Sequence, residues 1–329
     1  MTTSLPLERG QQGEAVRDLQ RRLIAAGFAP APTDWGHYGQ ETQASVSAFQ
    51  QARGLPADGI CDRVTWMALV EASWELGDRT LYLRVPNLRG DDVADLQRQL
   101  GRLGFDPGRV DGIFGPNTAA ALAEFQRNVE LTPADGICGA DTVQALRRLS
   151  GRAVPGPAVH MVREYERLSH GERTLLGRRV VVGQLGGLSA LARTLARALR
   201  VAGSSVLVLE EPDGARQAAA ANRFRADVYL GLTTAGAGRI AFYATADFES
   251  LGGHQLAEQL HAELTPVLPV PVAAPLGMRL PVLRETKMPA VLLELGPTRP
   301  VVDESPAVAA AVARALARWV AAPVSLDRG

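Results

Sequence analysis

The sequence has no excess of either charge, no long apolar run and only two cysteines. Its 329 residues include 35 Lys plus Arg and 35 Asp plus Glu, so the formal net charge is zero. This balance gives no sign of the basic surface typical of nucleic-acid-binding proteins. No run reaches the roughly 18 apolar residues that a membrane span needs, and "MTTSLPLERGQQGEAV" has no basic segment followed by an apolar one. We therefore expect a protein of the cytoplasm, free or peripheral to the membrane, with no membrane span and no nucleic-acid partner.

The two cysteines, Cys61 and Cys138, each end a copy of the hexapeptide "PADGIC". They could pair with each other, ligate a metal, or mark one position of a duplicated module. Duplication is favoured, because the pattern VxxLQxxLxxxGF precedes both copies. Equivalent positions in two copies of one fold lie far apart unless the copies dock on a symmetry axis, which disfavours a disulfide. No CxxC or Cys/His cluster accompanies either thiol, so we predict two small, half-buried residues rather than metal ligands.

Each copy is predicted to form three helices. The apolar residues of "GEAVRDLQRRLIAAGF" and "DDVADLQRQLGRLGF" follow one helical face and stop at Gly27 or Gly104 in the C-cap position. A second helix begins after "YGQET" or "FGPNT", and the turn in "ADGIC" leads to a short third helix. We assign the two modules to residues 5–75 and 84–150. A module of this length has a core that is only just adequate.

The repeated pattern resembles the peptidoglycan-binding module of bacterial cell-wall hydrolases. The motif "VDGIFGPNTAAALAEFQ" and a second DGxxGxxT turn carry the resemblance, which is closest from Val110 to Leu146. The first copy has "DWGHYG" where DGxFG is usual. The resemblance implies peptidoglycan binding. The motif positions are Gly39, Thr42, Phe49, Gln50, Asp58, Gly59, Gly115, Thr118, Phe125, Gln126, Asp135 and Gly136.

Most of these motif residues also have a structural interpretation. The phenylalanines are predicted to lie in the core, the glycines of the two ADGIC turns to supply positive φ, and the aspartates beside them to accept from amides two residues on. The glutamines could contact glycan or make interhelical hydrogen bonds. Trp35, His37 and Tyr38 lie outside the repeat pattern, and they either form a stacking platform for a sugar ring or pack within their loop.

The remainder of the chain has a different pattern. "GRAVPGPAVH" opens a predicted linker over residues 151–175, and short β-branched runs then alternate with helical segments over residues 176–324. The runs are "RRVVVG", "SSVLVLE", "ADVYLGL" and "PAVLLELG". Strands that alternate with helices predict an α/β domain with a mostly parallel sheet, covered on both faces. The fold class is therefore multidomain, with two all-α three-helix modules followed by an α/β domain.

This last domain resembles the zinc-dependent N-acetylmuramoyl-L-alanine amidase family. "RFRADVYLGL" and "LRETKMPAVLLELG" match segments before that family's last metal histidine and around its catalytic glutamate, which makes Glu294 the candidate catalytic residue. With the two modules, the architecture is similar to actinobacterial CwlM-type amidase-like proteins. The resemblance implies His, Glu and His as zinc ligands, but Leu185 or Gly186 stands at the first position and Thr233 at the third. From Arg173 through Leu209, where the second ligand is expected, there is no His, Asp, Glu or Cys.

The sequence offers no obvious replacement for these ligands. His254 and His261 lie two turns apart on one predicted helix, about 10 Å from each other, so they cannot share one ion. Glu294 lies within an apolar strand, where an unpaired carboxylate is costly. We therefore expect it to pair with an arginine such as Arg284 or to lie at the exposed end of its strand.

Two hypotheses of function follow. In the first, the chain is a non-catalytic pseudo-amidase without a cofactor, which binds peptidoglycan fragments or precursors and senses or regulates cell-wall precursor synthesis, with an enzyme of that synthesis as a further partner. In the second, it is an active amidase that uses zinc to hydrolyse the amide bond between muramic acid and the stem peptide. A weaker third possibility is that the modules serve as protein-interaction scaffolds.

Overall fold

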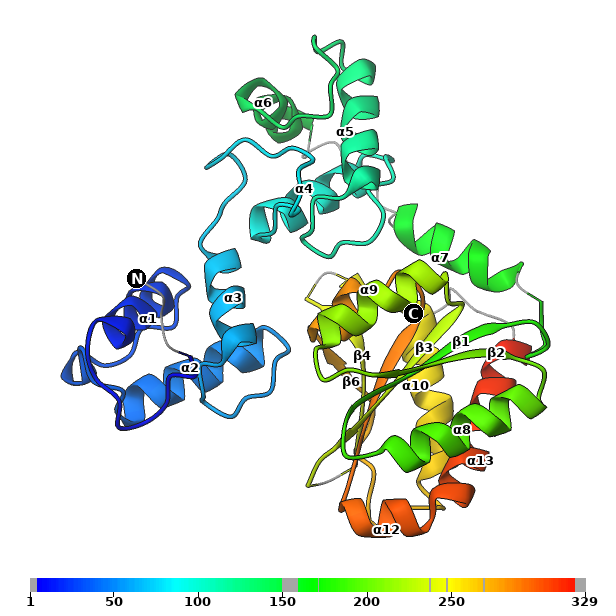
Figure 1. Ribbon diagram of the computed structural model, residues 1–329. Coiled ribbons are helices and arrows are strands. Elements are labelled where there is room, and N and C mark those ends of the chain that lie inside the picture. The colour runs from blue at the N-terminus through cyan, green and yellow to red at the C-terminus, as the bar shows by residue number, and fades with distance from the viewer. Residues whose placement is uncertain are drawn as a thin grey trace. The chain divides into compact units, whose positions relative to one another are not determined.

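The computed structural model describes residues 5–149, 159–170, 172–236, 238–246, 248–268 and 270–322. The chain divides into two compact units, Met1–Arg163 and Glu164–Gly329 (Figure 1). The first unit contains the helical modules and the second contains the α/β domain. Among the helices in these ranges, none has both the length and the hydropathy required to traverse a bilayer.

The first module consists of three helices, with a short 3-10 helix between the first two. Their bounds are Glu14–Ala25 for α1, Pro32–Asp34 for η1, Gln40–Ala52 for α2 and Arg63–Ala72 for α3. The helices turn their periodic apolar residues inward, and Leu19 and Leu69 belong to the resulting core. Gly27, with φ of 85°, follows the end of α1 as predicted. Backbone hydrogen bonds of 2.9 Å in both directions between Leu7 and Cys61 join the N-terminal segment to the turn before α3.

The second module repeats this plan. Its helices are α4 (Asp91–Arg102), α5 (Pro116–Asn128) and α6 (Ala140–Leu149), and Leu81 pairs with Cys138 as Leu7 pairs with Cys61. Both cysteines are free, and each lies in the core of its own module. They are more deeply buried than predicted, and burial raises the pKa of each thiol to about 12. Their places in two separate cores confirm that they are equivalent positions of a duplicated fold.

Part of the predicted linker is helical. Helix α7 spans Val159–Ser169, whereas residues 150–158 lie outside the described ranges. The carboxylate of Glu164 accepts from Ser250 Oγ at 3.0 Å and from the amides of Leu251 and Gly252 at 3.3 and 3.2 Å. These amides open helix α10 (Leu251–Leu264), where a negative charge is favourable. Glu164 therefore anchors this part of α7 to the α/β domain.

The α/β domain is built on one mixed sheet with the strand order β2-β1-β3-β7-β4-β5 and β6 beside β4. The strands are β1 (Arg179–Gly186), β2 (Ser205–Glu210), β3 (Val228–Thr234), β4 (Arg239–Thr245), β5 (Phe248–Glu249), β6 (Leu276–Met278) and β7 (Ala290–Leu295). The four predicted runs form β1, β2, β3 and β7, which pair in parallel. Strand β4 runs antiparallel to β7. The prediction of a mostly parallel sheet is confirmed, although the sequence did not reveal β4, β5 or β6.

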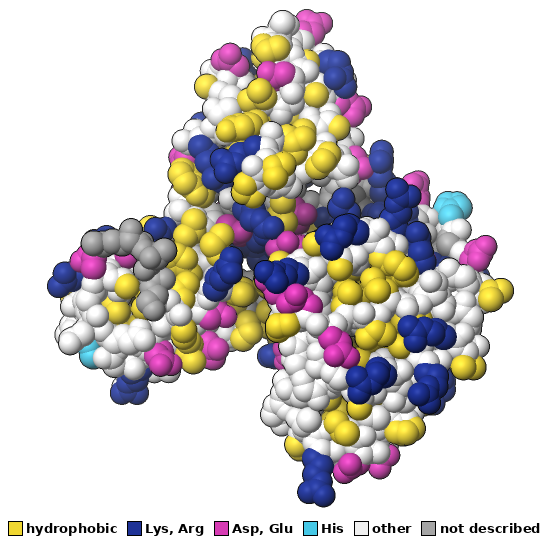
Figure 2. All heavy atoms as spheres, viewed as in Figure 1, with side chains coloured by type: hydrophobic (Ala, Val, Ile, Leu, Met, Phe, Trp, Pro, Cys, Tyr) yellow, Lys and Arg dark blue, Asp and Glu magenta, His cyan; other side chains and the backbone are white. Residues whose placement is uncertain are grey.

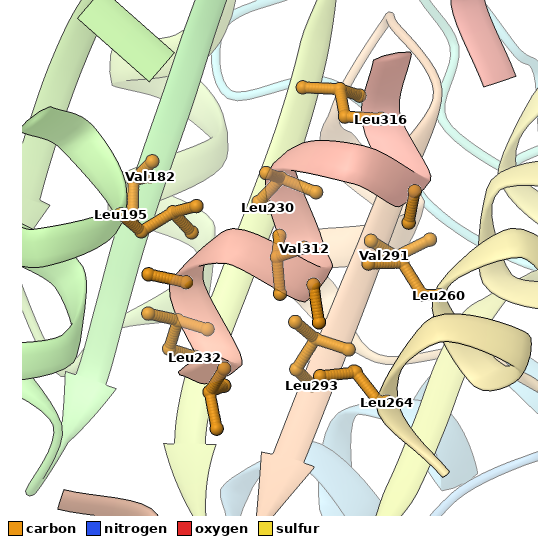
Figure 3. Close-up of a cluster of buried hydrophobic side chains, with 14 of the residues drawn as sticks. Val182, Leu195, Leu230, Leu232, Leu260, Leu264, Val291, Leu293, Val312 and Leu316 are labelled. Atoms are coloured by element: carbon orange, nitrogen blue, oxygen red, sulfur yellow. The ribbon is translucent and has the colours of Figure 1, made fainter. Parts of the chain in front are cut away.

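Helices cover both faces of this sheet (Figure 1). They are α8 (Ser189–Val201), α9 (Gly214–Phe224), α10, α11 (Pro281–Glu285), α12 (Thr298–Asp303) and α13 (Ser305–Ala321). Figure 3 shows the core on one face, where Leu230 and Val291 of the strands point toward Leu260 of α10 and Val312 of α13. Because side chains alternate along a strand, Tyr229 points to the other face, which α9 covers. The two-sided covering explains why the strands read as continuous apolar runs.

Candidate functional site

A buried glutamine holds the turn that follows the second helix of each module. Gln126 on α5 is only 2% exposed. Its Nε2 donates to the Ile137 carbonyl at 2.9 Å and to Thr142 Oγ1 at 3.1 Å, and its Oε1 accepts from the Gly136 amide at 2.8 Å. The side-chain amide is therefore occupied within the protein, and it ties α5 to the turn and to the start of α6.

The same arrangement occurs four times. Gln50 holds the equivalent turn of the first module, and Gln20 and Gln97 hold the first turn of each module from α1 and α4. All four glutamines, including Gln126, have an exposed fraction of 2% or less. We call this arrangement the glutamine clamp. Gln50 and Gln126 make the interhelical hydrogen bonds that one of the two interpretations predicted. The repeated "LQ" of the first helices was the sequence signal for Gln20 and Gln97.

The aspartates and glycines of the second turns have the predicted conformations. Asp58 and Asp135 each accept, through Oδ1, from the amide two residues on at 2.9 Å. Gly59 and Gly136 have φ of 70° and 73°, a region that residues with a Cβ rarely adopt. A Cβ on Gly136 would also lie 2.7 Å from the Ala119 carbonyl oxygen. These residues therefore fix the shape of the turn.

The phenylalanines and threonines of the motif are buried as well. Phe49 and Phe125 are fully enclosed, and each stands edge-on to a second phenylalanine with ring centroids 5.5 and 5.6 Å apart. Thr42 and Thr118 accept hydrogen bonds at 2.9 and 3.1 Å from the glutamine that clamps the first turn. These motif residues form the frame of the module.

The unusual loop of the first module keeps this frame. Tyr38 is fully buried, and its hydroxyl donates to the Gly59 carbonyl at 2.8 Å. It takes the place that Phe114 has in the second module, so a three-residue aromatic platform is wrong. Trp35, which is 50% exposed, and His37 remain at the surface. The motif glycines Gly39 and Gly115 follow as the N-caps of α2 and α5, with extended backbone.

In the α/β domain, four residues from neighbouring strands stand in one row. The register pairs Gly186 of β1 with Thr233 of β3, Thr233 with Glu294 of β7, and Glu294 with Arg239 of β4. An irregularity at Leu185 places Gly186, rather than Leu185, opposite Thr233. The row lies at the carboxyl ends of the parallel strands, where open α/β sheets bind their ligands. We call it the terminal row.

Glu294 is held by Arg239. Arg239 Nε donates to Glu294 Oε2 at 2.6 Å, and a second guanidinium nitrogen contacts the same oxygen. The Glu294 side chain is 11% exposed and that of Arg239 is 34% exposed, so the pair is partly shielded from water. Our expectation of Arg284 is corrected, because the antiparallel strand β4 brings Arg239 beside the carboxylate. Arg284 instead lies on α11.

The terminal row does not fit the zinc ion of the amidase family. A catalytic zinc takes three protein ligands and one water, and these ligands are His, Cys, Asp or Glu. Gly186 has no side chain, and the neutral hydroxyl of Thr233 is a poor zinc ligand. Arg239 places a positive charge on the one carboxylate in the row. Across the part of the chain that the structure describes, no group of three or more His, Cys, Asp and Glu could hold a metal.

The two histidines of α10 serve separate contacts. The ring of His254 stacks on Phe242 at 4.4 Å between centroids, and it contacts Glu249 and Glu258. His261 Nε2 lies 3.0 Å from the Val272 carbonyl oxygen, which gives this ring a role in packing.

A buried polar cluster joins the sheet to α9, and sequence analysis missed it. The hydroxyl of Tyr229 donates to Gln217 Oε1 at 2.6 Å, and Gln217 Nε2 donates to the backbone carbonyl of Gln184 at 3.0 Å. Burial raises the pKa of Tyr229, which keeps the hydroxyl protonated as a donor. The only sequence signal was a single glutamine on the apolar face of the predicted helix.

Both the helical modules and the α/β domain have known relatives. A family model described as a putative peptidoglycan binding domain matches residues 12–69 and 89–146. The chain is 33% identical over 332 residues to N-acetylmuramoyl-L-alanine amidase CwlM of Mycobacterium tuberculosis, covering 88% of this chain and 81% of that protein. It is 34% identical over 169 residues to N-acetylmuramoyl-L-alanine amidase CwlL of Bacillus licheniformis, covering 45% of this chain and 47% of that protein.

A solved structure, the N-acetylmuramoyl-L-alanine amidase AmiC2 of Nostoc punctiforme, aligns with 43% of this chain and 96% of its own, with 18% identity and a TM-score of 0.36. The relationship to CwlM extends over both helical modules and the α/β domain. The chain therefore belongs to the CwlM family, with two tandem peptidoglycan-binding modules followed by an N-acetylmuramoyl-L-alanine amidase-like domain.

Proposed function

We propose that this chain is a pseudo-amidase, a non-catalytic protein that binds peptidoglycan fragments or precursors and regulates cell-wall precursor synthesis. The observation that carries the proposal is the pairing of Glu294 with Arg239 in a terminal row that supplies no zinc ligand set. Peptidoglycan binding itself follows from the two modules.

The chemistry of the terminal row supports a non-catalytic role. Amide hydrolysis by this family's route requires a metal-bound water and a carboxylate free to accept its proton. Glycine and threonine cannot replace two histidines, and a guanidinium on Glu294 Oε2 opposes a divalent cation at the same oxygen. In the proposed role, Glu294 is vestigial as a catalyst and stabilises the pairing of β7 with β4 through Arg239.

Ligand recognition is assigned to exposed side chains around the clamped turns. The motif residues from Gly39 to Gly136 named above are the frame that positions those side chains. Trp35 and His37 are exposed beside the first turn of the first module, and Trp35 offers an aromatic surface for a sugar ring.

The proposed regulatory role places the protein in the cytoplasm, where precursors are made, with an enzyme of precursor synthesis as a partner. The free, buried thiols of Cys61 and Cys138 are compatible with a reducing compartment. Fractionation of cells that express the tagged full-length chain tests this location, and recovery of the protein in the cell-wall fraction or the culture medium would contradict it.

A second candidate function is an active N-acetylmuramoyl-L-alanine amidase that contains zinc. Two observations favour it: Glu294 stands at the carboxyl end of β7, and the relative that matches 88% of this chain carries the name of an amidase. Under this hypothesis Glu294 is the general base and Glu294→Gln abolishes turnover.

One purified sample of the full chain separates the two functions. Metal content is measured by elemental analysis before and after incubation with zinc, and release of stem peptide from muropeptides is followed by mass spectrometry. The pseudo-amidase hypothesis predicts substoichiometric zinc and no release, although the chain still co-sediments with purified peptidoglycan. Stoichiometric zinc with turnover that Glu294→Gln abolishes would establish the amidase instead. Failure to co-sediment would favour modules that act as protein-interaction scaffolds.

A further inference from the structure

The edge of the sheet at β2 carries a basic groove. Within the described residues β2 pairs only with β1, so its other side is an open edge. A groove of about 470 Å³ lies beside it, lined by Arg193, Arg197, Arg200, Val201 and Val208. The first four residues belong to α8 and the last to β2. Figure 2 shows Lys and Arg side chains next to hydrophobic ones on the face where Figure 1 places α8. The groove uses no residue of the terminal row.

Within the described part of the chain, the carboxylate of Glu210 is the one that contacts any of these three guanidinium groups. Arg193 Nη1 lies 3.4 Å from Glu210 Oε1, but the two side chains are 65% and 50% exposed, which makes this ion pair weak. Arg200 donates to the Val206 carbonyl at 3.0 Å. Arg197 is exposed, and no hydrogen-bond or ion-pair partner is found for it among the described side chains. The groove therefore has an unbalanced positive charge.

The backbone of β2 presents hydrogen-bonding groups to the same groove. The Val206 carbonyl points away from β1, because it accepts from Arg200 of α8. In a parallel ladder, residues two apart turn their backbone groups to the same side, so the N–H and C=O of Val208 also face the open edge. The side chains of Val206 and Val208 are half-buried against the core, which fixes the strand. An ordered edge of this kind can pair with an added strand.

We propose that this groove binds an extended, acidic segment of a partner protein, which adds to the sheet as a strand beside β2. The spacing of the arginines suits such a segment. On α8, Arg193 and Arg197 are separated by a rise of about 6 Å, and Arg197 and Arg200 by about 4.5 Å. Alternate residues of a strand are about 6.6 Å apart. Glutamates at every second position therefore reach successive guanidinium groups, while the intervening backbone pairs with Val208.

Charge selects the acidic segment over a second copy of this chain. If two copies paired through this edge, their arginines would face each other, and like charges at close range repel. An acidic strand gains both the backbone hydrogen bonds and the ion pairs. The interaction is independent of the proposed pseudo-amidase function, since it uses neither the modules nor the terminal row.

A fluorescent hexapeptide, Glu-Thr-Glu-Val-Glu-Thr, titrated into the full-length chain, tests the proposal by anisotropy. Binding is expected to weaken as salt is added. Two comparison peptides separate charge from strand pairing: one has lysine in place of glutamate, and the other has N-methylated residues between the glutamates. The proposal predicts that both comparison peptides bind more weakly than the acidic hexapeptide. Equal binding of the N-methylated peptide would overturn it, because charge alone would then explain the affinity.

Matched substitutions locate the site. Arg197→Glu is expected to weaken binding of the acidic peptide about tenfold, since an attraction becomes a repulsion. Arg223→Glu makes the same change on an exposed position of α9 and is expected to leave affinity unchanged. Both residues are exposed, so neither substitution should unfold the domain. Equal effects of the two substitutions, or full competition by inorganic phosphate or phosphatidylglycerol vesicles, would contradict a strand-binding groove.

Discussion

The glutamine clamp permits a quantitative test of what stabilises the second module. Gln126→Leu keeps a similar side-chain volume but removes the amide donors and the acceptor. The buried Gly136 amide then loses its partner at 2.8 Å, whereas the Ile137 carbonyl loses one donor at 2.9 Å and keeps the Gly139 amide at 3.3 Å. An unpaired buried amide costs about 1–3 kcal/mol and the second lost hydrogen bond about 1 kcal/mol, so we expect the module to lose about 2–4 kcal/mol of stability.

This loss is large for so small a module, since a core of this size supplies only about 3–5 kcal/mol. Hydrogen–deuterium exchange of the full chain, read by mass spectrometry, measures the effect. Peptides from α5 and α6 should lose most of their protection, whereas peptides from the α/β domain serve as an internal standard. Gln144→Leu makes the same chemical change at an exposed position of α6 and should alter stability by less than about 0.5 kcal/mol.

The comparison of these two variants shows whether the glutamine clamp stabilises the second module. If Gln126→Leu and Gln144→Leu exchange at the same rate, the clamp contributes no net stability. Our reasoning about buried amides in all four turns would then be wrong.

Three further predictions concern single residues. Arg239→Ala leaves the Glu294 carboxylate, which is only 11% exposed, without its cation. We expect the free energy of unfolding to fall by about 2 kcal/mol, which would lower the melting temperature of the α/β unit by about 4–8 °C. Glu294→Gln, which keeps an acceptor for Arg239, should lower it less, and calorimetry that gave the reverse order would contradict the ion pair. Burial raises the pKa of Cys61 and Cys138 from 9.0 to about 12. The thiols of the unfolded chain therefore lose their protons at a lower pH than those of the folded chain, and the free energy of unfolding should fall as the pH rises from 9.0 to about 12. Urea titrations check this, and an equal fall in the Cys-to-Ala variants would assign the effect to other groups. Tyr38→Phe removes a hydroxyl that donates to a buried carbonyl at 2.8 Å and should cost the first module about 1 kcal/mol by hydrogen exchange. If the stability of the first module did not change, water would have to replace the hydrogen bond from the Tyr38 hydroxyl to the Gly59 carbonyl.

Local pattern sufficed to predict much of the fold. The duplicated helices follow from apolar periodicity and glycine stops, and the four parallel strands follow from short β-branched runs between helical segments. The position of Glu294 near the end of its strand was also predictable. Strand β4 was missed because "RIAFYAT" contains one β-branched apolar residue and no clear alternation.

Contacts between distant segments could not be predicted in the same way. The partner of Glu294 depends on the antiparallel register of β4 against β7, which sequence spacing does not encode. The burial of Gln50 and Gln126 was ambiguous because a polar residue on a helix serves equally well at a surface or in a buried hydrogen-bond network. Only the position of the following turn, which supplies a carbonyl and an amide, decides between them.

The clamps direct most of their hydrogen bonds to main-chain atoms, and every amino acid except proline provides the same main-chain groups. Outward-facing positions of these turns can consequently change identity while the backbone keeps its path. Two modules with one skeleton are thus free to diverge in what they recognise, and a tandem pair can read two different features of a single cell-wall polymer.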